Sequence, residues 1–322
     1  MIKRAFIACA VLVALSVAGR AQAQDDPSKP IRLVVPWPPG GSNDVLARVL
    51  AEKLSISMGQ PVLVENKPGA SGNIGADFVA KAPPDGHTLL IAANNILTMN
   101  AALYQRMPFA STDFKAISML ATIPIVLVAG PSTHAASVGE LIAAARNDPG
   151  KLTYASSGMG SPQHLSAELF KSMTKTFIVH IPYKGQAPAI MDLIGGQVNV
   201  VFGAANSLLP HIKSGRLRAL GVTGRSRARV LPDVPTIAEA GVPGYESDTW
   251  VGLVAPAKTP VAIVERLNRE IRKAFALPDV IDNLAQQAIY AQTSTSAEFE
   301  KLITEDVKRW AAVIKNAGIK AE

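Results

Sequence analysis

One stretch, residues 31–44, constrains the fold of this chain more than any other. A strand pattern passes through a turn rich in proline and glycine, beside Trp37, into a helix pattern whose apolar residues recur at helical spacing from Asp44 onward. The first N–H groups of a helix have no partner within it and carry the positive end of the helix dipole. Glycines let a ligand approach the backbone closely. The stretch therefore predicts an anion-binding helix start, although many strand–turn–helix units share this pattern for structural reasons alone.

The same construction recurs twice. Residues 154–162 run from a strand through small residues to Ser161, a favoured N-cap, and Pro162, a favoured first helical residue. Residues 67–75 precede a short helix pattern at 76–81. We expect these three helix starts, rich in hydrogen-bond donors, to converge on a shared cleft.

The first 23 residues have the pattern of an export signal. Lys3 and Arg4 precede a short apolar stretch, and an A-x-A cleavage pattern ends at Ala23. We therefore expect cleavage after Ala23 and a periplasmic product. The apolar stretch is too short to span a membrane. The chain's single cysteine, Cys9, lies in this segment, so the mature protein would depend on its core rather than on disulfides.

Length and charge narrow the class of protein. The chain has 322 residues with 32 Lys and Arg against 25 Asp and Glu. Three of the basic residues lie in the signal, which leaves 29 basic against 25 acidic residues, a net charge of +4. The mature length suits two domains of ordinary size. No basic run or aromatic-studded basic stripe occurs, so we expect no nucleic-acid partner.

Strand patterns alternate with helix patterns along most of the chain, which indicates an α/β fold with largely parallel sheets and crossover helices. The expected strands are 31–35, 62–64, 88–92, 126–129, 176–181, 198–202 and 217–222. The expected helices include 138–146, 187–194, 207–213, one that starts at Pro260 and one at about 296–316. No long linker separates two parts, so two domains would have to be joined by crossing strands.

The sequence lacks the common catalytic and metal-binding patterns. It contains no G-x-S-x-G elbow, no H-E-x-x-H helix and no phosphate-loop lysine signature, and its five histidines lack metal-ligand spacing. We expect no catalytic residue, no metal and no cofactor. The serines at 156, 157 and 161 are more often hydrogen-bonding or capping groups than nucleophiles. A secreted hydrolase with a site assembled from distant residues stays a remote alternative.

Several segments resemble one known family, and they follow the family's order across the whole mature chain. The segments are 35–41, 65–70, 83–90, 157–161 with 164–165, 182–189, 209–215 with 217–220, and 250–256. In these segments the chain resembles the Bug (TctC-like) proteins, the extracytoplasmic solute receptors of tripartite tricarboxylate transporters. Each match is moderately specific, and their combination is highly specific.

The resemblance implies a type II periplasmic-binding-protein fold, with two α/β lobes of mainly parallel sheets around a ligand cleft. Residues 24–122 and 225–322 would form the first lobe and 123–224 the second, with two crossing strands as the hinge. It implies a periplasmic receptor, expected to be a monomer, that closes around a small carboxylate without chemistry and presents it to transporter subunits. The alternative is a ligand-dependent partner of a membrane sensor's outer domain.

We expect backbone amides, small hydroxyls and one aromatic wall to hold the ligand. The candidate ligand-binding residues are Trp37, Gly40, Gly41, Ser42, Asn43, Asp44, Ser71, Gly72, Ala93, Asn94, Ser156, Ser157, Gly158, Ser161, His164, Lys184, Gly185 and Gly203. Trp37 would cover the ligand or pack at the hinge. Lys184 would be the cation nearest to the turns; in the alternative it is a solvated loop residue. His164 would face the ligand; in the alternative it only begins a helix.

Gly203 departs from the family pattern. Family members often carry an aspartate after this strand, where this chain has glycine. An acidic group there could meet an amine, so its absence weakens the case for an amino-acid ligand. In the alternative, the position only shapes a loop.

Overall fold

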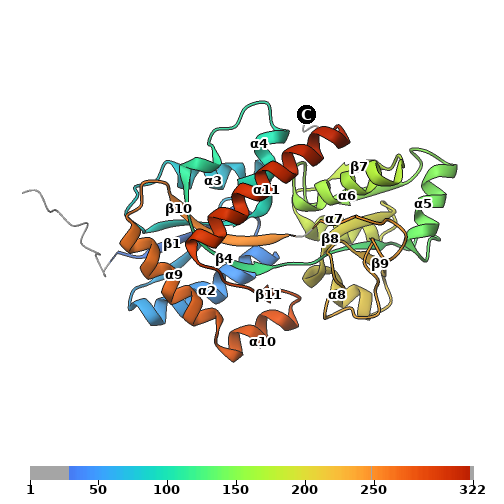
Figure 1. Cartoon of the computed structure of the whole chain (residues 1–322). Helices are drawn as coiled ribbons and strands as arrows, with labels where there is room; N and C mark the ends of the chain where they lie inside the picture. Colours follow the sequence, from blue (N-terminus) through green and yellow to red (C-terminus); the bar gives the residue numbers. More distant parts are fainter. Residues whose placement is uncertain (1–28, 248, 320–322) are drawn as a thin grey trace, which may run out of the picture.

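Two β-sheets, each covered by helices on both faces, build the two lobes of the computed structural model, which describes residues 29–247 and 249–319 (Figure 1). The expected export signal lies outside these residues. Within them, no helix is long and apolar enough to cross a membrane.

The first lobe contains a six-stranded sheet. Its strands are β1 (Ile31–Val35), β2 (Val62–Asn66), β3 (Thr88–Ala93), β4 (Phe114–Thr122), β10 (Trp250–Pro256) and β11 (Tyr290–Ala291), in the order β11-β4-β10-β3-β1-β2. Its helices are α2 (Ser42–Met58), α3 (Asn73–Ala80), α4 (Asn100–Leu103), α9 (Val261–Phe275), α10 (Pro278–Gln286) and α11 (Ser296–Ala317). Short 3-10 or π turns span Ala70–Gly72, Asn95–Met99 and Ser111–Asp113.

Strand β1 explains how this sheet is covered on both faces. Its alternate residues Ile31, Leu33 and Val35 pack into a core with α2, α9 and α10, while Val34 packs with α3 and α11 on the other face. Side chains of a strand alternate between the two faces, so a strand buried on both has a continuous apolar sequence. This burial is why the sequence of residues 31–35 predicts a strand so clearly.

The second lobe contains a five-stranded sheet. Its strands are β5 (Ile125–Ala129), β6 (Thr153–Ser156), β7 (Val179–Pro182), β8 (Val200–Ala204) and β9 (Arg218–Val222), in the order β7-β6-β8-β5-β9. Helices α5 (Val138–Asn147) and α6 (Pro162–Thr174) cover one face, and α7 (Gln186–Ile194) and α8 (Ala205–Lys213) cover the other.

Both sheets are mixed rather than mainly parallel. The pairs β1–β2, β1–β3, β6–β7 and β6–β8 are parallel, as expected. Strand β10 is antiparallel to β3 and β4, and β5 is antiparallel to β8 and β9. The reason is the path of the chain: β5 and β10 follow the two crossings between lobes, so they run away from the cleft while their neighbours run toward it.

The lobe boundaries of the sequence analysis stay a prediction, but the packing bears on one of them. The first crossing falls between Thr122 and Ile125, next to the expected boundary. After β9, however, Ile237, Val242 and Tyr245 pack into the core of the second lobe with α5 and α6. These contacts favour a return to the first lobe close to Trp250, later than residue 225.

Helix α11 connects the two lobes on one side. It crosses from the first lobe toward the second (Figure 1), and Trp310 and Ile314 pack there with Leu165 of α6 and Leu103 of α4. This apolar helix contact thus joins the lobes in addition to the two strand crossings.

The packing of β10 gives a stability prediction. A Cβ atom at Gly252 would collide with the ring of Phe299, which is fully buried and has nowhere to move. We expect Gly252→Ala to lower the free energy of unfolding by about 1–3 kcal/mol, as overpacking does. Gly139→Ala in α5 is the control, because its Cβ would make only an ordinary contact, 3.9 Å from Ser137 Oγ; it should leave stability unchanged or raise it by up to about 1 kcal/mol. Urea denaturation compares the two, and equal stability of both variants would contradict the packing.

Candidate functional site

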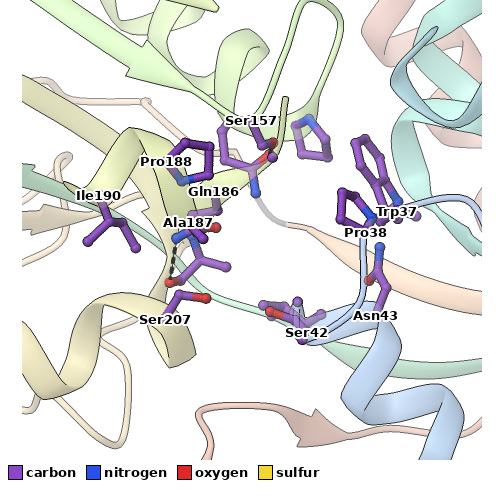
Figure 2. Close-up of a pocket in the computed structure, with 18 of the residues that line it drawn as sticks. Trp37, Pro38, Ser42, Asn43, Ser157, Gln186, Ala187, Pro188, Ile190 and Ser207 are labelled. Atoms are coloured by element: carbon purple, nitrogen blue, oxygen red, sulfur yellow. Dashed lines mark hydrogen bonds between the residues drawn. The ribbon is translucent and has the colours of Figure 1, made fainter. Parts of the chain in front are cut away.

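A cavity of about 490 Å³ lies between the lobes. Figure 2 shows Trp37, Pro38 and Asn43 on one side of it, and Ala187, Pro188 and Ile190 on the other. The cavity lies where the strands of both sheets end, apart from β5, β10 and the short edge strand β11, which run away from that end. Ligands of α/β proteins bind at such carboxyl ends of strands.

Asp44 orders the first-lobe wall. Its buried carboxylate accepts hydrogen bonds from the Gly40 N–H (3.0 Å), from Asn66 (3.0 Å) and from Arg48 (2.9 and 3.1 Å). Burial alone would raise the pKa of Asp44, but the hydrogen bonds from Arg48, Gly40 and Asn66 outweigh it and lower the pKa. Asn66 also donates to the Trp37 carbonyl (3.0 Å). The turn that carries Trp37 is therefore fixed by a charged group that does not itself line the cavity.

Helix α2 presents its start to the cavity without a side-chain cap. Its N-cap, Gly41, has no side-chain hydrogen bond to give, and Gly41, Ser42 and Asn43 all line the cavity. The Asp44 N–H donates to the Gly41 carbonyl (3.0 Å), so the main-chain N–H groups of Ser42 and Asn43 are those that can meet an acceptor. The Ser42 hydroxyl instead donates across the cleft to Asn206 Oδ1 in α8 (2.6 Å).

The second-lobe wall repeats the arrangement with two helix starts. Helices α7 and α8 have Gly185 and Ala204 as N-caps, and neither has a side-chain cap. The Gln186 side chain ties the two starts together: its Oε1 accepts from the Ala204 N–H (3.0 Å) and its Nε2 donates to the Ala204 carbonyl (3.1 Å) (Figure 2). Three helix starts without side-chain caps thus border one cavity, although at α8 the N–H groups of Ala204 and Ala205 already donate to Gln186 and to the Pro124 carbonyl.

Half of the residues expected at the site line the cavity. These are Trp37, Gly40, Gly41, Ser42, Asn43, Ala93, Ser157, Lys184 and Gly185. The other half lie elsewhere, namely Asp44, Ser71, Gly72, Asn94, Ser156, Gly158, Ser161, His164 and Gly203. The ligand-binding role of both groups stays a prediction.

The turn at residues 67–75 does not reach the cavity with the other helix starts. Ser71 donates to the main-chain oxygen of Met159 in the other lobe, and the Tyr104 hydroxyl donates to the same oxygen (3.2 Å). Beneath the turn, Asn95 donates to the Ser71 carbonyl (3.0 Å). This turn forms a second contact between the lobes rather than a wall of the cavity.

Gly203 lies inside β8 rather than after a strand, because β8 ends two residues later than expected. A Cβ there would stand 2.6 Å from Gln186 Nε2 and 2.8 Å from Leu208 Cδ1. The missing side chain at Gly203 is what allows Gln186 to lie along the strand.

His164 lies behind the cavity wall, in a buried aromatic stack. Its ring stacks on His180 (4.4 Å between centroids), which stacks on Tyr154 (4.6 Å). Burial, then the nearby charge of Lys171, lowers the pKa of His164 to about 4. Burial, then repulsion from His164, lowers the pKa of His180 to about 3. Ser156 is hydrogen-bonded to His180 Nε2 (2.7 Å) and is itself buried, so this serine–histidine pair is closed to a ligand in this structure.

Sequence reasoning missed much of the lining. The additional lining residues are Pro38, Pro39, Ile123, Ile125, Pro162, Gln163, Gln186, Ala187, Pro188, Ile190, Met191, Ala204, Ser207, His211 and Thr249. Those at 186–188 lie within a motif already singled out, next to Gly185. The β8–α8 junction could have been found only as another strand-to-helix passage, because it has no glycine–serine turn.

The cavity has little formal charge. Among the described lining residues, Lys184 is the single Lys or Arg, and none is Asp or Glu. His211 also lines the cavity, and burial followed by the charge of Arg216 lowers its pKa. No group of three His, Cys, Asp or Glu in the described ranges could hold a metal ion.

The family model described as "Tripartite tricarboxylate transporter family receptor" matches residues 46–319. The chain belongs to this family. Protein BugT of Bordetella pertussis is 39% identical over 306 residues, which cover 94% of each chain. A UPF0065 protein from the tcbD-tcbE intergenic region of Pseudomonas sp. is 42% identical over 315 residues, covering 97% of this chain and 94% of that protein.

Solved structures agree with the fold. Rpa4515 of R. palustris, solved with adipate, is 38% identical with a TM-score of 0.88, covering 92% of this chain and 99% of that one. MatC of Rhodopseudomonas palustris, solved with malate, is 30% identical with a TM-score of 0.82, covering 89% and 99%. The periplasmic binding protein BugD is 31% identical with a TM-score of 0.84, covering 92% and 100%. The expected type II periplasmic-binding-protein fold and the Bug resemblance are confirmed.

The buried histidines give a prediction for stability against pH. Both pKa values are lower in the folded protein than the ordinary value of about 6.5, so the unfolded chain binds more protons as pH falls. The free energy of unfolding should therefore keep its full value above about pH 6.5. It should fall as pH drops toward 4, by up to about 1.4 kcal/mol per pH unit for each histidine. Urea denaturation from pH 7 to 4 measures it. His180→Asn should flatten the curve, whereas His134→Gln, at an exposed position, should not; equal slopes would contradict the assignment.

Proposed function

We propose that this protein is a periplasmic receptor that captures a small carboxylate-bearing solute between its lobes and delivers it unchanged to a membrane transporter. The main support for this proposal is that three helix starts without side-chain caps, from both lobes, meet at one cavity. The relatives solved with adipate and malate support a carboxylate.

Neutral donors can supply the necessary affinity. A hydrogen bond to a charged group contributes about 1.5–3 kcal/mol, and a helix start adds about 0.3–2 kcal/mol. A few such contacts together would reach about 8 kcal/mol, which corresponds to a micromolar dissociation constant. Lys184 would add a cation at the rim without being required.

Closure would follow from binding by both walls at once. A ligand that touches α2 and α7 together binds the closed state better than the open one, and this difference in affinity shifts the equilibrium. The Ser42–Asn206 bond and the contacts to Met159 would then hold the lobes together around it. Transporter subunits would recognise the closed surface, after export and cleavage following Ala23.

A ligand screen tests the proposal. We expect small carboxylates to raise the melting temperature reversibly, and mass spectrometry of the recovered ligand to show it unchanged. Turnover of a stabilising ligand, or no response to any carboxylate, would refute a carboxylate receptor.

Trp37 should contribute to the apolar wall of this site. Trp37→Ala removes the indole that lines the cavity, so affinity for the identified acid should fall about tenfold or more, as for a lost large apolar contact. Isothermal titration calorimetry measures it, with Phe177→Ala, an exposed aromatic outside the cavity, as the control. Unchanged affinity in Trp37→Ala would assign Trp37 to packing alone.

Affinity should depend little on pH. The helix-start donors do not titrate, His164 is buried with a pKa of about 4, and the pKa of His211 is lowered too. Calorimetry should therefore give dissociation constants within about twofold between pH 6 and 8. A steep loss of binding with rising pH would instead place a charged histidine on the ligand.

A further inference from the structure

Most of the cavity surface beyond the helix starts is apolar. The first lobe contributes Trp37 and Pro38, the second contributes Ile190 and Met191, and Ile123 lies at the crossing between them. A ligand held by its carboxylate at the helix starts would lay the rest of its body on these side chains.

The lining offers no partner for a positive charge. None of the described lining residues is Asp or Glu. Two carboxylates are next to a lining residue in sequence: Asp44 is already occupied by Arg48, Asn66 and the Gly40 N–H, and Asp192 accepts a hydrogen bond from the Tyr183 hydroxyl (2.6 Å). An ammonium group removed from water without a counter-charge is strongly unfavourable. The cavity therefore disfavours a ligand that carries an amine.

The Gln186–Gly203 pair keeps its own part of the second-lobe wall uncharged, although Lys184 of the same lobe also lines the cavity. Gln186 uses both ends of its amide on Ala204, at 3.0 and 3.1 Å, and Gly203 gives it the room to do so. Each end of the amide thus has one partner within the protein, which fixes its orientation.

The unpartnered polar atoms at the cavity are neutral as well. Trp37 Nε1, His211 Nδ1 and Thr249 Oγ1 are buried without a hydrogen-bond partner, and burial followed by the charge of Arg216 lowers the pKa of His211. Trp37 follows β1 and Thr249 precedes β10, with β3 between them, so both lie at the same end of the first sheet, on strands roughly 10 Å apart. An indole N–H can only donate, so it calls for an acceptor such as an oxygen on the ligand.

The cavity is also large for a short acid. At about 30 Å³ per water molecule, about 490 Å³ corresponds to roughly 16 waters. A ligand with a larger apolar body than a short acid would fill more of that space and displace more water from the apolar walls.

We propose that the ligand is a carboxylate with an apolar body of about six or more carbons and no ammonium group, either aromatic or aliphatic. This deepens the proposed function and rests on it. Amino acids and short hydroxy acids are the classes that the cavity selects against.

Matched acids test the absence of an amine. Calorimetry would compare 3-phenylpropanoate with phenylalanine, and adipate with 2-aminoadipate, since each pair differs by one ammonium group. Of the two pairs, the one whose amine-free acid binds more tightly decides the test. In that pair we expect the amine-free acid to bind at least tenfold more tightly than its amino counterpart. Equal binding within that pair overturns the inference and leaves the carboxylate receptor intact, whereas no binding by any carboxylate overturns the proposed function itself.

Chain length and one exposed methionine test the apolar body. From butanoate to octanoate, affinity should rise by up to about fourfold per added methylene until the cavity is filled. Met191→Ser should reduce that rise, while Met173→Ser in α6, outside the cavity, should not. Met191 is 64% exposed, so its loss should not unfold the protein. A length series without any rise would overturn the inference.

A charge placed on the neutral wall provides an independent check. Gln186→Glu places a carboxylate beside Ala204, and this negative charge repels the carboxylate of a ligand. The tightest-binding amine-free ligand should therefore bind at least tenfold more weakly, and its advantage in affinity over its amino counterpart should shrink. Gln197→Glu, in the exposed turn after α7, is the matched control and should change neither value. An unchanged preference in Gln186→Glu, with the fold intact by circular dichroism, would contradict a role of this wall in selection.

Discussion

The direction of the strands is the constraint on which the rest of this structure depends. In both lobes the strands run toward the cleft, except β5 and β10, which leave it after the chain has crossed, and the short strand β11 at the outer edge of the first sheet. A helix that follows a strand must then begin at the cleft, with its unpaired N–H groups pointing there. The starts of α2, α7 and α8 meet for this reason. The protein can gather positive potential at one place while keeping almost all formal charge away from it.

The buried carboxylate of Asp44 shows how charge is used without being offered to a ligand. It holds the turn before α2 through Gly40 and connects that turn, through Asn66, to the neighbouring strand. Arg48 neutralises it from the exposed side of the same helix. Such a group preorganises the donors of the turn, and a donor that need not reorient binds more tightly. The same principle appears on the opposite wall, where Gln186 fixes two helix starts with an uncharged amide.

Local patterns in the sequence predicted many of the elements, but they missed β4, β10 and α10, and they predicted the site only in part. Residues 31–44 predicted both a strand–turn–helix unit and a cleft wall, because burial on both faces of β1 and the glycine turn are local properties. The turn at 67–75 has the same local chemistry, yet it follows the edge strand β2 and meets Met159 instead. Strand order decides which turns share a cleft, and no spacing within one segment encodes it. Gln186 and the start of α8 were missed because their contact depends on the space left by Gly203, a relation between two segments.

A crystal structure of the protein with adipate would show whether the helix starts hold the ligand. We expect carboxylate oxygens at about 3 Å from main-chain N–H groups at the starts of α2 or α7, with the carbon chain on Trp37 and the opposing apolar wall. A carboxylate held mainly by Lys184, or a ligand bound outside the cavity between the lobes, would contradict it.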